Sequence, residues 1–192
     1  SYLDNPPASV QGNPLVVILA SGDPLFFGIG RLVLSTFPSH QVTVHPHLSS
    51  IQLAFSRIKL PWHDAHLISA HGRSLDEAQQ VIKQGHPKVA ILTDGQNSPG
   101  AIARMVADLG FSHLYHVWVC ENLGSRDERV HRYEIDELAF AGRSDLQRLA
   151  TVRAVETDYS VLNVVVLVRA AGDDADMNLD DMTIDNDPSI PT

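Results

Sequence analysis

The chain contains a single cysteine, Cys120, which excludes an internal disulfide framework and a zinc site built from cysteine pairs. It also lacks an uninterrupted run of about 18 apolar residues, the minimum for a membrane-spanning helix. No segment of basic and then apolar residues opens the chain, so no secretory signal is predicted. We therefore expect a cytoplasmic protein that does not bind a membrane.

Positive charge is scarce as well, with 14 Lys and Arg against 23 Asp and Glu and a formal net charge of −9. This balance argues against a partner made of nucleic acid. Seven Asp but no Lys or Arg lie in residues 172–192, so the rest of the chain is close to neutral. We expect residues 171–192 to form a disordered acidic tail.

Residue patterns for metal binding and for covalent catalysis are also missing. Although the chain has ten histidines, its close pairs lack a third ligand at a diagnostic spacing. No Gly-x-Ser-x-Gly elbow and no Cys–His arrangement is present. These close histidine pairs are His45/His47, His63/His66 and His113/His116. We therefore predict no metal site.

What the sequence does contain is an alternation of apolar runs with helical patterns. Hydrophobic residues make up 44% of the 192 residues, enough for one large domain or two small ones. The patterns predict strands at 15–20, 41–45, 66–70, 88–93, 115–121, 129–134 and 161–168, and helices at 25–36, 49–58, 74–84 and 98–109. Strands separated by helices indicate an α/β fold with a mostly parallel first sheet, whereas the later strands indicate a mixed second sheet.

The segment Lys59–Trp62 reads as a connector between two lobes. We therefore predict an incomplete N-terminal α/β lobe over residues 1–60 and a C-terminal α/β lobe over residues 61–170. The opening residues 1–14 are rich in Pro, Asn and Ser and are expected to form a loop.

Five polar turns follow the predicted strands, where an α/β sheet binds its ligands. Simple structural roles remain open for several of them. Asp23 is equally explained as a helix cap, and Ser49 or Ser50 as a helix N-cap, while His71 alone is better explained by a structural hydrogen bond. The turns lie in the segments SGDPLFFGIG (21–30), PHLSSIQ (46–52), SAHGRS (69–74), LTDGQNSP (92–99) and ENLG (121–124).

In this order, and with LNVVVL (162–167) after them, these segments resemble the tetrapyrrole methylase family from about residue 15 to residue 169. The resemblance implies a fold of two α/β lobes, usually a homodimer, with S-adenosylmethionine bound in the cleft between the lobes. Within the family the motifs are most similar to the branch that methylates C5 of a precorrin in cobalamin biosynthesis. A separate partner for C15 methylation and decarboxylation is compatible with this, since the acidic tail does not resemble the domain that carries those activities.

The resemblance also implies site residues. We expect the substrate's carboxylates to be met by arginines, foremost Arg73, and either His71 or Asp94 to assist proton movement, without a choice between them. The expected cofactor contacts are Ser21, Gly22, Asp23, Phe26, Ser49, Ser50, Thr93 and Leu123, with Asn163 and Val164 as weaker candidates near the adenine.

The chain departs from the family pattern at two places. The family begins with a strand and a loop of the type GxGPG, and neither is found upstream of Leu15. His47 stands where relatives commonly carry Gly. Methylation of another tetrapyrrole position, of uroporphyrinogen or of a non-tetrapyrrole substrate therefore remains an alternative, as does a non-catalytic fragment that binds the tetrapyrrole or the cofactor.

Overall fold

The protein's structure is a computed structural model that describes residues 15–141 and 159–170. The chain divides into two compact units between His47 and Leu48. Helix α2 (Ser50–Ile58) belongs to the second unit because it packs against the sheet there. The division therefore falls before this helix, whereas the predicted boundary at residue 60 lies after it. The predicted acidic tail lies outside the described residues.

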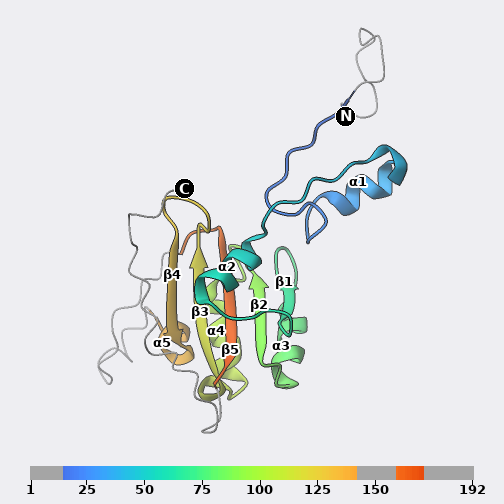
Figure 1. The fold of residues 1–192 in the computed structure, drawn as a ribbon. Coiled ribbons are helices and arrows are strands. Elements are labelled where there is room, and N and C mark those ends of the chain that lie inside the picture. The colour runs from blue at the N-terminus through green and yellow to red at the C-terminus, as the bar shows by residue number, and fades with distance from the viewer. Residues whose placement is uncertain (1–14, 142–158, 171–192) are drawn as a thin grey trace. The chain divides into compact units, whose positions relative to one another are not determined.

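The second unit is built on one mixed sheet with the strand order β1-β2-β5-β3-β4 (Figure 1). Only β1 and β2 pair in parallel, and the other neighbours are antiparallel. The strands are β1 (His66–Ser69), β2 (Lys88–Leu92), β3 (Tyr115–Glu121), β4 (Arg129–Glu134) and β5 (Asn163–Arg169). The expected mixed second sheet is therefore present, and all five of its strands were predicted to within two residues at each end.

Strand β5 occupies the centre of the sheet although it is the last strand of the described residues. Its residues Val164–Val168 are all buried, and an unbroken apolar run of this kind needs cover on both faces and a neighbour on both edges. Pairing with β2 on one side and β3 on the other supplies those neighbours. The sequence LNVVVL thus determines which strand becomes central.

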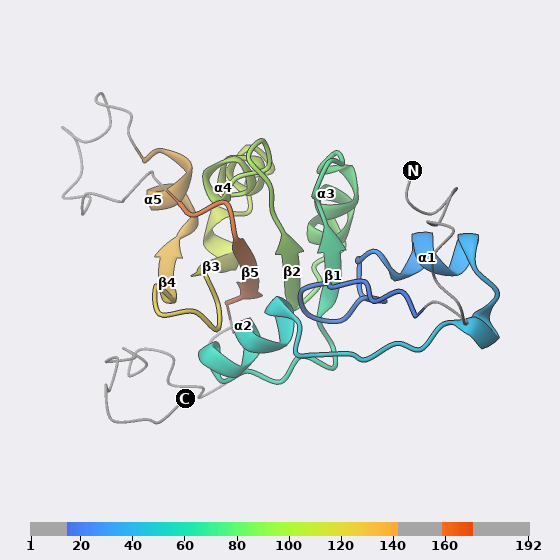
Figure 2. The same ribbon diagram turned by 90° about the horizontal axis from the view of Figure 1, so that it is seen from above.

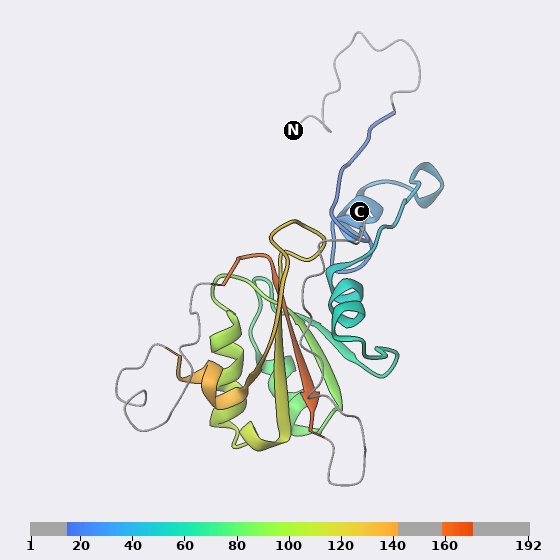
Figure 3. The ribbon, with the colours of Figure 1, turned by 60° about the vertical axis from the view of Figure 1, so that its left-hand side comes forward.

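Helices cover both faces of this sheet. Side chains on one face pack with α3 (Asp76–Lys83), α4 (Pro99–Asp108) and α5 (Ile135–Ala139) in a single core. Helix α2 covers the opposite face, where its residues Ile51, Ala54, Phe55 and Ile58 are at most 1% exposed. Figures 2 and 3 show α2 and the other three helices on opposite sides of the strands.

The first unit differs from the sequence prediction. Its described residues contain helix α1 (Gly30–Thr36) and the short 3-10 helix η1 (Ser39–Gln41), but no strand at 15–20 or 41–45. Residues 15–19 are exposed, including Leu15 at 89% and Leu19 at 92%. A strand is stable only when neighbours satisfy its backbone and cover its side chains, and among residues 15–47 none does. The predicted parallel first sheet is therefore absent from the part of the chain that the structure describes.

Helix α1 is also shorter than the predicted helix 25–36. Residues before Gly30 form turns instead: Gly30 N–H donates to Pro24 O at 2.8 Å, and Phe27 has a left-handed φ of 51°. A Cβ built at Gly28 would lie 2.7 Å from Pro24 O, and one at Gly30 2.6 Å from the same atom. Both glycines are required for this close approach, which the helical pattern did not reveal.

Two short helices of the second unit were not predicted, α5 and the 3-10 helix η2 (Ser112–Leu114). In α5, Ile135, Leu138 and Ala139 are buried, and Glu134 and Glu137 form a capping box at its start. Five residues are too few to show a helical period beside a preceding strand. No helix in the described part of the chain has the length and the apolar character needed to cross a membrane.

Cys120 provides a test of this packing. It lies in β3 between Val130 of β4 and Val164 of β5 and is fully buried. Burial, assisted by Glu128 and Glu121, raises the pKa of its thiol to about 12. Because the thiolate is the reactive species, we expect slow labelling by a thiol reagent at about pH 8 in the native protein and fast labelling in denaturant. Equal rates under the two conditions would contradict the packing of β3.

Candidate functional site

Four turns of the second unit meet at one edge of the sheet. Ser69 at the end of β1 pairs with Leu92, Leu92 pairs with Val164, and Val164 pairs with Cys120. Since β5 runs antiparallel to both neighbours, its beginning lies beside their ends. We call this the carboxyl edge, formed by residues 70–73, 93–97, 121–124 and 160–163. The turns HGR, LTDG and ENLG, each predicted at a strand end, come together here.

The turns after β1 and β2 are joined by Asp94 and Asn97. Gly72 N–H donates to Asp94 Oδ2 at 2.7 Å. The side-chain amide of Asn97 donates to Ala70 O at 2.7 Å and to Arg73 O at 2.9 Å. These bonds fix the backbone of residues 70–73, while the side chains of His71 and Arg73 remain exposed.

Asp94 is engaged by three backbone N–H groups, those of Gly72, Gln96 and Asn97. The N–H groups of Asn97 and Gly72 hold the pKa of this carboxyl below its ordinary value of 3.8. A carboxylate stabilised in this way is a weak proton acceptor near neutral pH. These hydrogen bonds give Asp94 a structural role, because they join the turn after β1 to the turn after β2.

Thr93 and Asn163, both expected cofactor residues, are bonded to each other. The Thr93 hydroxyl lies 2.6 Å from Asn163 Oδ1 and 2.9 Å from Asn163 O, and donates toward these oxygens. Thr93 is only 6% exposed, and Val164 only 1%. The side chains of Thr93 and Val164 are therefore buried at the carboxyl edge and support the residues around them, whereas Asn163 is partly exposed.

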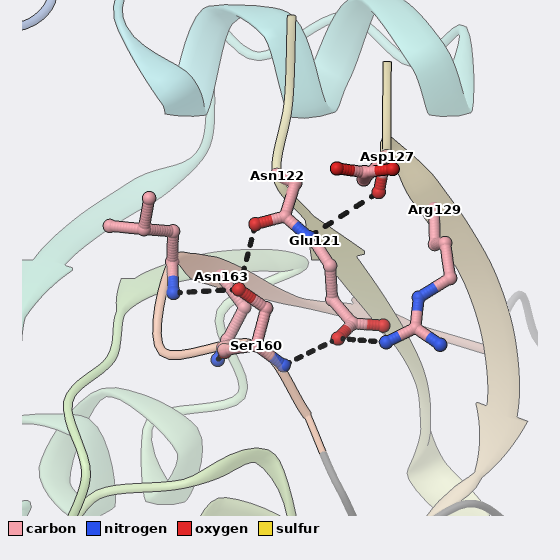
Figure 4. A network of polar contacts seen from close by, with 7 residues as sticks. Glu121, Asn122, Asp127, Arg129, Ser160 and Asn163 are labelled. Atoms are coloured by element: carbon pink, nitrogen blue, oxygen red, sulfur yellow. Dashed lines mark hydrogen bonds and ion pairs between the residues drawn. The ribbon is translucent and has the colours of Figure 1, made fainter. Parts of the chain in front are cut away.

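A buried carboxylate, Glu121, ends strand β3 and is 2% exposed. Its Oε1 accepts from the Arg129 guanidinium at 2.9 Å and from Ser160 N–H at 2.7 Å (Figure 4). The Ser160 hydroxyl donates to Asn122 Oδ1 at 2.7 Å, and Asn163 Nδ2 donates to Ser160 O at 2.6 Å. The end of β3 is thereby tied to the beginning of β5.

Leu123 lies in a tight turn between Asn122, which has a left-handed φ of 49°, and Gly124, with a φ of 80°. Gly124 N–H donates to Glu128 Oε2 at 2.6 Å, and Glu128 forms an ion pair with Arg57 of α2. Burial raises the pKa of Glu128, but Arg57 and the Gly124 N–H outweigh it, so that the net shift is downward. The Gly124 N–H of this turn is thus bonded to a carboxylate that is itself paired with α2.

Ser49 has the structural role that the sequence left open for it. Its hydroxyl accepts from Gln52 N–H at 3.2 Å, and its own N–H donates to Gln52 Oε1 at 2.8 Å, which is a capping box at the start of α2. Ser49 is 9% exposed, whereas the neighbouring Ser50 is exposed.

The remaining expected cofactor residues belong to the first unit. Gly22 has a left-handed φ of 67°, and its carbonyl accepts from His47 N–H at 3.2 Å. Asp23 Oδ1 accepts from Leu25 N–H at 2.8 Å, and Asp23 O accepts from Phe26 N–H at 3.0 Å. Asp23 therefore stabilises its own turn. Ser21 is exposed, and Phe26 is partly exposed with its ring against that of Phe27.

Sequence reasoning missed Asn97, Glu121 and the exposed apolar pair Val161 and Leu162. Val161 is 77% exposed and Leu162 70% exposed, beside Asn163 at the carboxyl edge. A Glu at the end of an otherwise apolar strand was a signal for Glu121. Asn97 gave no such signal, because its partners are backbone carbonyls in another loop.

The carboxyl edge suits a ligand with a nucleoside body. Exposed apolar side chains, partly exposed amides and a Cβ-free Gly95 with open space around it can form the wall and the polar contacts that such a ligand needs. Among the residues that the structure describes, no group of three His, Cys, Asp or Glu could hold a metal ion.

A model of the family described as Tetrapyrrole (Corrin/Porphyrin) Methylases matches residues 7–139. The chain is 34% identical over 152 residues to the cobalt-precorrin-7 C(5)-methyltransferase of Salmonella typhimurium, covering 79% of this chain and 65% of that protein. It is 38% identical over 120 residues to the precorrin-6Y C(5,15)-methyltransferase [decarboxylating] of Sinorhizobium sp, covering 62% of this chain and 28% of that protein.

A solved structure also resembles the fold. It is the uroporphyrin-III C-methyl transferase from Thermus thermophilus complexed with S-adenyl homocysteine. The TM-score is 0.54 at 20% sequence identity, covering 77% of this chain and 62% of that chain. The chain thus spans somewhat less than two thirds of the Salmonella and Thermus proteins, and 28% of the Sinorhizobium protein.

The contacts of Asp94 predict an acid-sensitive contribution to stability. Because its folded pKa is lowered, the stabilisation is present above the ordinary pKa of 3.8 and is lost as pH falls through the folded pKa. We expect Asp94→Asn to lower the free energy of unfolding at neutral pH, by an amount that shrinks as the pH falls below about 4. Urea unfolding at a series of pH values measures this.

The exposed Asp108, at the end of α4, provides the matched control Asp108→Asn. This variant removes an exposed carboxylate elsewhere on the chain and should not reproduce the loss of stability at neutral pH that is expected of Asp94→Asn. A difference between Asp94→Asn and wild type that stays constant down to pH values well below 4 would rule out the lowered pKa of Asp94.

Proposed function

The chain belongs to the tetrapyrrole (corrin/porphyrin) methylase family, and from this premise we propose that it is an S-adenosylmethionine-dependent methyltransferase that methylates C5 of a precorrin in cobalamin biosynthesis. The single observation that supports this most is the 34% identity to a cobalt-precorrin-7 C(5)-methyltransferase along 79% of the chain. The carboxyl edge is consistent with it, because it combines exposed apolar side chains with few free charges.

The proposed cofactor supplies an electrophilic methyl group on a sulfonium. The protein's task is then placement, since an electron-rich tetrapyrrole carbon can attack such a methyl without a covalent enzyme intermediate. In our proposal the partly exposed turn Asn122–Gly124 and residues 160–163 contact the cofactor directly, and the buried Thr93 and Val164 side chains support these segments. Ser49, Ser50 and the turn of Ser21–Asp23 with Phe26 remain predicted contacts.

Substrate orientation is assigned to the turn after β1. The tetrapyrrole carries several carboxylates, and the exposed Arg73 guanidinium can bind them bidentately. The backbone of this turn is fixed by Asp94 and Asn97, so Arg73 starts from an ordered base. We assign any proton movement to His71, which is exposed in the same turn.

Some features of the proposal rest on the family resemblance alone. These are the two-lobed arrangement with the cofactor between the lobes, the homodimer and a separate partner for C15 methylation and decarboxylation. The proposed cytoplasmic location rests on the composition of the sequence instead. The precorrin-6Y C(5,15)-methyltransferase matches this chain over only 28% of its own length. We therefore propose the C5 step and not the C15 step for this chain.

The experiment that tests the proposed function is methyl transfer by the 192-residue chain from isotopically labelled S-adenosylmethionine to a precorrin, with the product analysed by mass and by carbon position. We expect one labelled methyl group, at C5. A methyl at another carbon would favour the alternative of a different tetrapyrrole position. Binding of S-adenosylhomocysteine without turnover would favour the alternative of a non-catalytic binding fragment.

Arg73 separates substrate binding from cofactor binding. Arg73→Ala should raise the Michaelis constant for the tetrapyrrole about tenfold, since one bidentate charge pair is lost, and leave the affinity for S-adenosylhomocysteine nearly unchanged. Arg169→Ala is the matched control, because Arg169 is exposed at the end of β5, where it pairs with Tyr115 at the opposite end of the strands from the carboxyl edge. Kinetics equal to those of the control would mean that Arg73 is only a solvated turn residue.

A further inference from the structure

Burial of the Glu121 carboxylate needs an explanation beyond stability. A carboxylate removed from water loses solvation that an ion pair only partly returns, and apolar replacements of such pairs are often as stable or more so. Cys120 precedes Glu121 in the strand and is fully buried, while the partners of Glu121 in the neighbouring strands are Asn163 of β5 and Arg129 of β4. What an apolar side chain could not provide is a directed hydrogen bond to Ser160.

Ser160 is the centre of the bonds at the beginning of β5. Its N–H donates to Glu121, its hydroxyl donates to Asn122, and its carbonyl accepts from Asn163. The hydroxyl also accepts from Leu162 N–H at 3.3 Å. Among these partners only Glu121 carries a charge, and the Arg129 guanidinium donates a hydrogen bond to the same carboxylate, as Figure 4 shows.

The turn of residues 160–163 presents its apolar side chains to solvent. Val161 and Leu162 are exposed, although Leu162 is held at its carbonyl by Asn122 N–H at 2.9 Å and at its N–H by Ser160. Ordering the backbone that carries exposed apolar side chains brings no gain in buried area to the protein itself. A ligand that packs against them does gain, because the ordering is already present before it binds.

We propose that Glu121 is a positioning residue, which fixes Ser160 and thereby holds Val161 and Leu162 as an ordered apolar wall for the nucleoside part of the cofactor. This inference rests on the proposed function, because it takes S-adenosylmethionine as the ligand of the carboxyl edge. Glu121 itself does not touch the ligand. It acts through two backbone segments, the end of β3 and the beginning of β5.

The test is the affinity for S-adenosylhomocysteine, measured by isothermal titration calorimetry with the full chain well below the melting temperatures of all variants. Glu121→Gln keeps the size of the side chain but removes the charge shared by Arg129 and Ser160. We expect its dissociation constant to rise about tenfold. The Michaelis constant for the tetrapyrrole at saturating S-adenosylmethionine should stay close to that of wild type.

Val117→Ala is the matched control for stability, because Val117 is fully buried in the middle of the same strand. It should lower the melting temperature without changing the affinity. An equal loss of affinity in Val117→Ala would mean that Glu121 has a merely structural role, and would overturn the inference. Wild-type affinity in Glu121→Gln would overturn it as well, while the proposed function would stand.

Leu162→Ala keeps the inference testable even when Glu121→Gln does not fold. The side chain is 70% exposed, so its removal should leave the fold intact. We expect weaker binding of S-adenosylhomocysteine, and unchanged affinity would show that residues 160–163 form no wall for the ligand. If the wild-type chain does not bind S-adenosylhomocysteine at all, the proposed function fails, and this inference fails with it.

Discussion

The antiparallel insertion of β5 between β2 and β3 is the constraint on which the site depends. Strands β2 and β3 end at the same edge only because each pairs with β5 in the opposite direction. The run of buried residues from Val164 to Val168 makes this central position the favourable one, since it removes apolar side chains from water on both faces of the sheet. The same pairing brings Asn163 next to Thr93 and Glu121 next to Ser160. Packing in the middle of the sheet thus determines which polar groups meet at its edge.

Most charged and polar side chains at this edge are bonded to the protein and not left for a ligand. Asp94 is occupied by backbone N–H groups, Glu121 by Arg129 and Ser160, and Glu128 by Arg57 and Gly124. The side chains that remain exposed are the apolar Val161 and Leu162 and the polar His71, Arg73 and Gln96. In the proposed function, the apolar pair would contact the cofactor and Arg73 the carboxylates of the substrate.

The second unit could be predicted well because its elements show in local patterns. Strands 115–121 and 129–134 match β3 and β4 to the residue, and the turns after three strands mark the carboxyl edge. The first unit could not be predicted in the same way. The apolar run 15–20 has the pattern of a strand, but no partner strand is found among residues 15–47. Strand formation depends on partners distant in the sequence, which a local pattern does not contain. For the same reason the bonds of Asn97 and Glu121 to other segments became visible only in the fold.

We propose that the carboxyl edge of the second unit binds the methyl-donor cofactor. Backbone amide NMR shifts of the chain, recorded while S-adenosylhomocysteine is added, test this binding. Within the second unit, the largest changes should fall in residues 70–73, 93–97, 121–124 and 160–163. The opposite edge, where β2 and β3 begin after residues 84–87 and 110–114, should show little change. Changes concentrated at that opposite edge, or none at saturating ligand, would rule out binding at the carboxyl edge.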